Sequence, residues 1–315
     1  NGVWQVIVGN GPNSTAGNAQ FIMINLQSGT VTTVDTGGSS DNGLSAVAAW
    51  SSYGNGITDL LFAGDLQGNM WRLPVGASSA TKLFVAKDTQ GNTQPISVAP
   101  LLGTDPDTGK LWLFFGTGRY LSNDDMSNNA AQTWYGLKDA TSSINRNELV
   151  KRSILVERDD DTYAVRVTEV GTTADLSNKA GWYIDLPTSG ERMVVSNIFQ
   201  QDALIGTVRI PNISDMCQPT GRGFIMAINP FAGARLDRTF FDLNGDGEFD
   251  EQDQITINGV NSIVSGIGFD SSPNSPIFIG NVMYVVKDNG LTNTVWTQGA
   301  DANARRTAWR EVVNQ

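Results

Sequence analysis

The sequence contains no histidine and only one cysteine, Cys217, among its 315 residues. Without histidine the chain lacks the usual general base and the commonest zinc ligand, so neither Ser–His nor Cys–His catalysis can be built from it. A single cysteine cannot form an internal disulfide or hold a cysteine-rich metal site. Cys217 is therefore either a buried free thiol or the partner of a cysteine outside these residues.

Long hydrophobic runs and positive charge are also scarce. No run of about 18 apolar residues occurs, so no segment is predicted to span a membrane. Charged residues make up 17% of the chain, and the formal net charge of −11 argues against nucleic-acid binding because it repels a phosphate backbone. The chain starts without methionine or a signal peptide, and Trp4–Val8 already has the pattern of a strand. We therefore expect a fragment that begins inside a fold.

The chain does contain many short hydrophobic runs separated by polar turns. Runs such as Phe21–Leu26, Met70–Val75 and Phe224–Asn229 are bounded by turn-forming residues, and 34 residues are glycine. This pattern is typical of strands joined by tight turns and not of helices. The best candidate helix, Ala300–Asn314, keeps a helical period only weakly. The sequence therefore predicts an all-β chain.

One strand–turn–strand unit recurs along the chain. In Phe62–Leu73 a strand enters a Gly-Asp turn and a second strand leaves with a tryptophan, and related units occur at Phe114–Leu121 and Tyr284–Gly290. A spacing of about 40–60 residues between such units is typical of a β-propeller. The repeats indicate roughly five blades of a modified, quinoprotein-like β-propeller. The ring is expected to be incomplete because the chain is a fragment.

Residues 1–315 are predicted to form one propeller domain with two interruptions. Ser122–Gln132 is rich in Asn and Asp and has the composition of a long loop. Between residues 141 and 180, the alternating segments Ser153–Val156 and Tyr163–Val170 flank a charged run. We expect a hairpin insertion on one blade there, with the charged run as its solvated turn.

Residues 242–253 are the most distinctive motif, an acidic twelve-residue loop with Gly247 in the sixth position. Calcium prefers about six to eight oxygen ligands, and a tight loop turns alternate side chains inward. The glycine supplies the sharp turn that such a loop needs. The predicted metal ligands, at the first, third, fifth, seventh, ninth and twelfth positions, are Asp242, Asn244, Asp246, Glu248, Asp250 and Asp253.

These ligands are expected to bind in different ways. Glu248 stands where such loops offer a backbone carbonyl, and Asp250 binds directly or through water. Asp253 replaces a longer glutamate, so it binds with one oxygen or none. The alternative is an acidic surface turn without metal, which five matched positions and a glycine in register disfavour. Because the flanks are not helical, we expect the loop on a β scaffold, as a structural clip or a slow switch.

The chain resembles the C-terminal propeller domain of the PilY/PilC family, the tip-associated adhesins of type IV pili. The resemblance spans most of the chain and is carried by Ala63–Leu73, Phe115–Leu121, Gly181–Arg192, Thr207–Pro211, the Cys217 region and Thr307–Glu311. In that family the propeller carries one calcium in a loop of this type. The resemblance therefore implies Ca²⁺ as the cofactor of residues 242–253.

The resemblance also implies a non-enzymatic function. Family members are pilus-tip or biogenesis proteins that support pilus extension and retraction, twitching motility and surface adhesion. The implied partners are minor pilins or the pilus tip complex, together with a host or abiotic surface. The implied location is extracellular, at the pilus tip or outer cell surface, after export through the periplasm.

Two other functions fit a propeller. A quinoprotein-type dehydrogenase would share the blades, but such enzymes usually hold the quinone with a vicinal disulfide, and this chain has one cysteine. A carbohydrate-binding propeller stabilised by calcium is the third possibility, because a fold alone does not define a function. A quinone absorbance band after reconstitution would favour the enzyme, and binding to a glycan array would favour the lectin.

Overall fold

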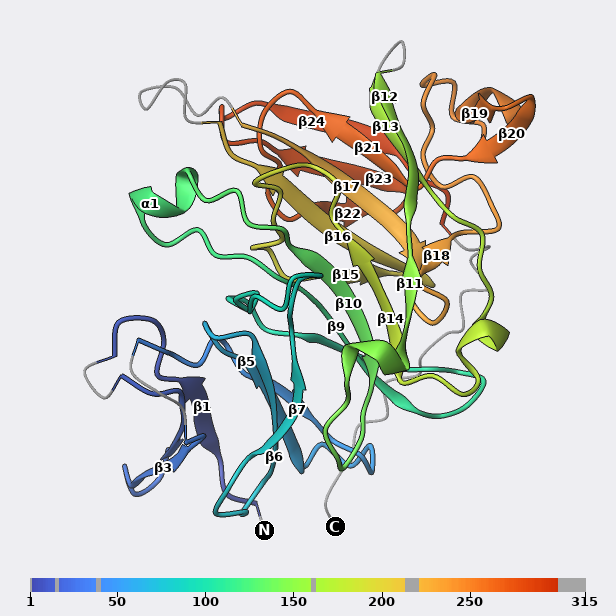
Figure 1. Ribbon diagram of the computed structural model, residues 1–315. Helices are drawn as coiled ribbons and strands as arrows, with labels where there is room; N and C mark the ends of the chain where they lie inside the picture. Colours follow the sequence, from blue (N-terminus) through green and yellow to red (C-terminus); the bar gives the residue numbers. More distant parts are fainter. Residues whose placement is uncertain (1, 15–16, 38–40, 160–162, 213–220, 300–315) are drawn as a thin grey trace.

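The computed structural model describes residues 2–14, 17–37, 41–159, 163–212 and 221–299. Nearly all regular elements of these residues are β-strands, with one short α-helix and three 3-10 turns, so the all-β prediction is confirmed (Figure 1). Cys217 and the candidate helix Ala300–Asn314 lie outside the described residues. No helix in the described part of the chain is long and apolar enough to cross a membrane.

Five sheets, antiparallel except for one strand pair, follow one another along the described residues and are here numbered sheet 1 to sheet 5. Sheet 1 contains β1 (Gln5–Gly9), β2 (Gln20–Asn25) and β3 (Val31–Asp35). Sheet 2 contains β4 (Ala48–Trp50), β5 (Leu60–Gly64), β6 (Asn69–Pro74) and β7 (Thr81–Val85). Sheet 3 contains β8 (Leu101–Thr104), β9 (Leu111–Gly116), β10 (Thr133–Lys138) and β14 (Gly181–Asp185), with β11 (Leu149–Arg152) added parallel to β14.

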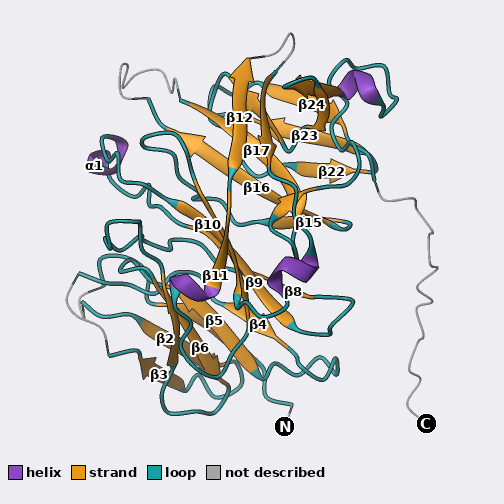
Figure 2. Cartoon of the chain, turned by 45° about the vertical axis from the view of Figure 1, so that its right-hand side comes forward, coloured by secondary structure: helices purple, strands orange, loops and turns teal. Residues whose placement is uncertain are grey.

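The later sheets continue this order. Sheet 4 contains β15 (Ile198–Gln200), β16 (Ala203–Ile210), β17 (Arg222–Asn229), β18 (Ala234–Arg235), β21 (Gly266–Phe269), β13 (Ala164–Thr168) and β12 (Ile154–Asp159). Sheet 5 contains β22 (Ile277–Ile279), β23 (Val282–Val286) and β24 (Thr292–Trp296). A separate hairpin is formed by β19 (Gln254–Ile257) and β20 (Val260–Ile263). The helical turns are α1 (Asn123–Met126), Arg146–Glu148, Thr173–Leu176 and Glu251–Asp253, and they lie in connections between strands (Figure 2).

At Asp65, hydrogen bonds to the side chain explain the Gly-Asp turn that recurs along the sequence. Its buried carboxylate accepts the backbone N–H groups of Gln67 and Asn69 at 3.0 and 2.9 Å, and the Trp71 indole N–H at 2.8 Å. Gly68 completes the turn at φ +81°, in the left-handed region that favours glycine. The aspartate therefore fixes the β5–β6 turn and anchors the aromatic residue of the outgoing strand.

The sheets stack face to face, and each pair of consecutive sheets shares one of four hydrophobic clusters. Because side chains alternate between the faces of a strand, neighbouring residues belong to different clusters. Leu61 packs with residues of sheet 1, whereas Phe62 packs with residues of sheet 3. Likewise Leu113 packs towards sheet 2 and Phe114 towards sheet 4. A middle sheet is therefore buried on both faces, and it packs against the next sheet on each side as a propeller blade does.

The outer faces of sheets 1 and 5 have no sheet against them among the described residues. Both carry exposed apolar side chains, namely Trp4, Val6, Val8, Leu26 and Val31 on one and Ile277, Ile279, Val286 and Trp296 on the other. None of the described sheets closes on itself. The arrangement is therefore an open series of blades, consistent with the predicted incomplete ring.

Residues 141–180 lie on two sheets. β11 extends sheet 3, while β12 and β13 pair as an antiparallel hairpin whose inner strand joins β21 of sheet 4. The hairpin is thus held as the edge of a blade. Its status as an insertion into the repeat stays a prediction.

Candidate metal centre

The acidic loop 242–253 begins beside sheet 5. Phe241 forms an antiparallel bridge with Thr297, just beyond β24. The Asp242 N–H donates to the Trp296 carbonyl at 3.0 Å, and the Gln298 N–H donates to the Phe240 carbonyl at 2.8 Å. The loop ends at a short 3-10 turn, Glu251–Asp253, which leads directly into β19. Both ends of the loop are therefore fixed by β structure, as the non-helical flanks predict.

The first half of the loop folds around Asp242. One oxygen of this buried carboxylate accepts the Gly245 N–H at 2.6 Å, and the other accepts the Gly247 N–H at 2.8 Å. Gly245 and Gly247 have φ of +80° and +83°, and a Cβ at either position would meet nothing within 4 Å. Glycine is thus required here for its backbone conformation and not for space.

The exposed rim of the loop is also ordered by side-chain acceptors. Asn244 Oδ1 accepts the Asp246 N–H at 3.0 Å, and Asp246 Oδ1 accepts the Glu248 N–H at 2.8 Å. Asp250 caps the following 3-10 turn by accepting the Gln252 N–H at 2.7 Å. Turn-forming Asx side chains of this kind stabilise the local backbone, with or without a metal.

Asp253 closes the loop from its far end. Its buried carboxylate accepts the N–H of Leu243 at 2.7 Å, of Asn244 at 3.4 Å and of Asp250 at 3.3 Å. Burial raises the pKa of Asp253 above its usual value, and the negative charge of Asp242 adds to the increase, although the three N–H groups oppose it. The last loop position therefore joins the two ends of the loop.

The predicted ligands divide into two groups by exposure. Asp242 and Asp253 are buried, whereas Asn244, Asp246, Glu248 and Asp250 are exposed. In the part of the chain that the structure describes, no three His, Cys, Asp or Glu side chains gather as a metal-binding group, and the loop carboxylates accept backbone N–H groups. The six side chains therefore lie in one loop, but they do not converge on a common metal position.

The chemistry of the loop nevertheless fits calcium. Its side-chain donors are all oxygen, the donor type that calcium prefers. A carboxylate oxygen that accepts one N–H keeps a further lone-pair direction for a cation. Two buried carboxylates, Asp242 and Asp253, have no basic side chain in contact with them among the described ion pairs. A cation in this loop would offset their mutual repulsion.

Two features of the site could not be found from the motif. The Phe241–Thr297 bridge depends on a segment more than 50 residues away, and the three N–H contacts of Asp253 depend on the closed shape of the loop. The only sequence signal is the run of apolar flanking residues, Phe240, Phe241 and Leu243, all of which are buried.

Four tryptophans lie inside the packing between sheets. Trp112, Trp134 and Trp182 are buried in the cluster between sheets 3 and 4. Trp71 is buried in the cluster between sheets 1 and 2. These side chains therefore contribute to the packing between blades.

Comparison with known proteins identifies the relatives of the chain. A scan against models of protein families finds no match. A type IV pilus biogenesis factor PilY1 homolog from Xylella fastidiosa is 47% identical over 323 residues, covering 99% of this chain. The chain is homologous to PilY1. The type IV pilus biogenesis factor PilY1 of Pseudomonas aeruginosa is 29% identical and covers 84% of the chain. The predicted family is therefore confirmed.

The fold of the chain is that of the PilY1 C-terminal domain. The crystal structure of this domain from Pseudomonas aeruginosa matches with a TM-score of 0.78 and 22% identity, covering 94% of this chain and 70% of that chain. This match confirms the predicted β-propeller class. The chain spans 26% and 27% of the length of the two PilY1 relatives, so most of each relative lies outside the aligned region.

Proposed function

We propose that this chain belongs to a protein of type IV pilus biogenesis and that its loop 242–253 binds Ca²⁺. The observation that carries the first part is the 47% identity to a PilY1 homolog over 99% of the chain. The oxygen-only loop, with Gly245 and Gly247 in left-handed conformation, supports the second part.

The proposed ligands are those of the acidic loop. Asp242 faces the buried side of the loop, and Asn244 and Asp246 form its exposed rim. Glu248 offers its backbone carbonyl, and Asp250 supplies a carboxylate or a bound water. Asp253 holds the loop closed, so its contribution to a cation is mainly its negative charge. Bound calcium supplies the positive charge that these carboxylates lack.

Calcium binding to the loop changes stability by mass action. A ligand at about 100 times its dissociation constant stabilises the folded chain by about 2.7 kcal/mol. We therefore expect a higher melting temperature in millimolar calcium than in chelator. Equal melting temperatures in calcium and in chelator would exclude a stabilising role for the cation.

In the cell, the proposed role is non-enzymatic support of pilus extension and retraction, twitching motility and surface adhesion. The proposed partners are minor pilins or the tip complex and a host or abiotic surface. The proposed location is the pilus tip or outer cell surface, reached through the periplasm. Homology to proteins named as pilus biogenesis factors supports this assignment.

A pair of substitutions tests the proposal. Asp246→Ala removes an exposed loop carboxylate, and Asp107→Ala removes an exposed carboxylate in the β8–β9 turn as a matched control. On the purified chain, we expect Asp246→Ala to weaken calcium binding in a calorimetric titration and Asp107→Ala to leave it unchanged. In the source organism, Asp246→Ala should reduce piliation and twitching. Normal calcium binding, piliation and twitching in the Asp246→Ala strain would overturn the proposal.

A further inference from the structure

The acidic loop starts at a single β-bridge beside sheet 5. Phe240–Asp242 runs antiparallel to the residues that follow β24, through the two backbone hydrogen bonds that flank the Phe241–Thr297 bridge. Thr297 in turn donates its N–H to the Asn281 carbonyl at 2.7 Å, next to β23. The first residue of the loop is therefore joined to sheet 5 by main-chain bonds.

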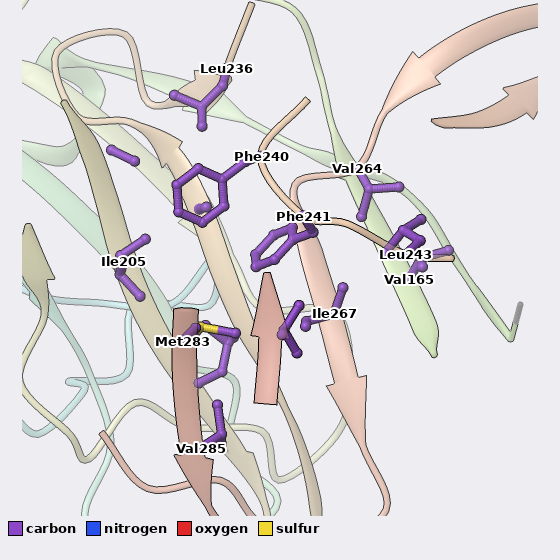
Figure 3. Close-up of a cluster of buried hydrophobic side chains, with 14 of the residues drawn as sticks. Val165, Ile205, Leu236, Phe240, Phe241, Leu243, Val264, Ile267, Met283 and Val285 are labelled. Atoms are coloured by element: carbon purple, nitrogen blue, oxygen red, sulfur yellow. The ribbon is translucent and has the colours of Figure 1, made fainter. Parts of the chain in front are cut away.

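The same segment packs into the interface between sheets 4 and 5. Phe240, Phe241 and Leu243 are buried in the cluster that includes Ile267 of sheet 4 and Met283 of sheet 5 (Figure 3). The two phenylalanine rings meet edge to face, with centroids 4.9 Å apart. Apolar residues on both sides of the first loop ligand thus fill the space between the two blades.

The other end of the loop belongs to sheet 4. After Asp253 the chain forms the β19–β20 hairpin and enters β21, which lies between β13 and β17. Ile255 of β19 and Val264, just before β21, are buried in the same interface cluster. Asp253 accepts the Leu243 N–H at 2.7 Å and the Asn244 N–H at 3.4 Å, and these hydrogen bonds connect the segment on sheet 5 to the segment leading into sheet 4.

We propose that loop 242–253 is a calcium-dependent clasp that holds sheet 5 against sheet 4. This inference rests on the proposed binding of calcium to the loop. The clasp is formed by the chain itself, through the backbone pairing of Phe240–Asp242 with sheet 5, the buried Leu243 and the closing carboxylate of Asp253. Loss of the cation leaves Asp242 and Asp253 as two unneutralised buried carboxylates at the point where the blades join. Sheet 5 then separates from sheet 4 before the other blade interfaces open.

Hydrogen exchange of the 315-residue chain tests the clasp directly. Backbone N–H groups of Val282–Trp296 are protected by pairing within sheet 5, whereas those of Leu60–Pro74 lie in sheet 2, far along the series of blades. At calcium about 100 times its dissociation constant, openings that require calcium release are suppressed about 100-fold. We expect exchange at Val282–Trp296 to slow by this factor relative to chelator, and exchange at Leu60–Pro74 to stay unchanged.

Two leucine substitutions separate the clasp from general destabilisation. Leu243→Ala removes a buried contact of the clasp and leaves every proposed calcium ligand in place. Leu149→Ala removes a similarly buried leucine from the cluster between sheets 2 and 3. We expect Leu243→Ala to bind calcium but to lose most of the calcium-dependent slowing at Val282–Trp296. Leu149→Ala should keep the full slowing.

Calcium binding is measured by titration calorimetry on the same samples. If calcium binds and exchange at Val282–Trp296 does not change, the clasp is wrong and the proposed calcium site stands. If exchange slows equally in sheets 2 and 5, calcium stabilises the whole chain and the local clasp is also wrong. If no calcium binds, the proposed site itself fails.

Discussion

The buried ion cluster around Arg166 of β13 supports a quantitative prediction. The guanidinium is fully buried and donates through Nη1 and Nη2 to the two oxygens of Glu191 at 2.5 and 3.1 Å. It also donates to Glu157 of β12 at 2.6 and 3.0 Å, and its Cζ lies 3.7 Å from the centre of the Phe224 ring. Glu191 is itself fully buried. The cluster joins the β12–β13 hairpin to the loop before β15.

Glu191→Ala should destabilise the chain strongly. Removing one partner of a buried ion pair costs about 3–5 kcal/mol because the remaining charge is left without compensation. Glu157 still pairs with Arg166 and is partly exposed, so the lower end of this range, about 3 kcal/mol, is expected. The double substitution Arg166→Met/Glu191→Leu removes both buried charges. It should therefore cost less than Glu191→Ala alone.

Urea unfolding at 25 °C, followed by circular dichroism, measures these differences. The midpoints of the original chain, Glu191→Ala, Arg166→Met and the double variant form a thermodynamic cycle. An exposed control, Glu251→Ala, should shift the midpoint little. A loss below about 1 kcal/mol for Glu191→Ala, or a double variant as unstable as the sum of the two single variants, would refute the assignment of a coupled buried pair.

Three further outcomes are expected. Asp253→Ala removes the acceptor of three loop N–H groups and should lower stability in chelator by about 1–3 kcal/mol, measured by thermal melting. Burial alone would raise the pKa of Asp125, but N–H donors and the Arg119 guanidinium hold it below the usual value. This carboxylate therefore stabilises the fold above its unfolded pKa, about 3.9, and the stabilisation is lost as pH falls through the lower folded pKa. In the Asp125→Asn variant, the urea concentration at the unfolding midpoint should therefore fall less steeply as the pH is lowered below about pH 4. Gly136→Ala would place a Cβ 2.4 Å from Cε2 of Trp182 and should cost about 1–3 kcal/mol in urea unfolding, and an unchanged midpoint would contradict this packing.

The strands could be predicted from the sequence because their chemistry is local. Short apolar runs between turn-forming residues identify elements such as β5 and β6, and the Asp65 turn repeats a pattern visible in the residues alone. The twelve-residue loop could be found for the same reason, since its oxygen side chains and Gly247 are close in sequence. Strands that are apolar at nearly every position, such as β5, also indicate that both faces of a middle sheet are buried.

The parts that could not be predicted depend on residues distant in sequence. β11 pairs in parallel with β14 across about 30 residues, and nothing in its four residues indicates that partner. The bridged segment Phe240–Asp242 is too short to show a period. Asp253 matches the last ligand position by spacing, and only the closed loop shows that its carboxylate accepts three backbone N–H groups.

The apolar outer faces of sheets 1 and 5 have a consequence for the behaviour of this chain in solution. The two faces are different surfaces at opposite ends of the series of sheets, so a contact between them joins one molecule to the next head to tail. Such a contact does not close on itself after two copies, and it leaves a free apolar face at each end. The isolated 315 residues should therefore associate into open-ended oligomers whose length grows with concentration. Replacing the half-exposed Trp296 by lysine should shorten them in light-scattering measurements.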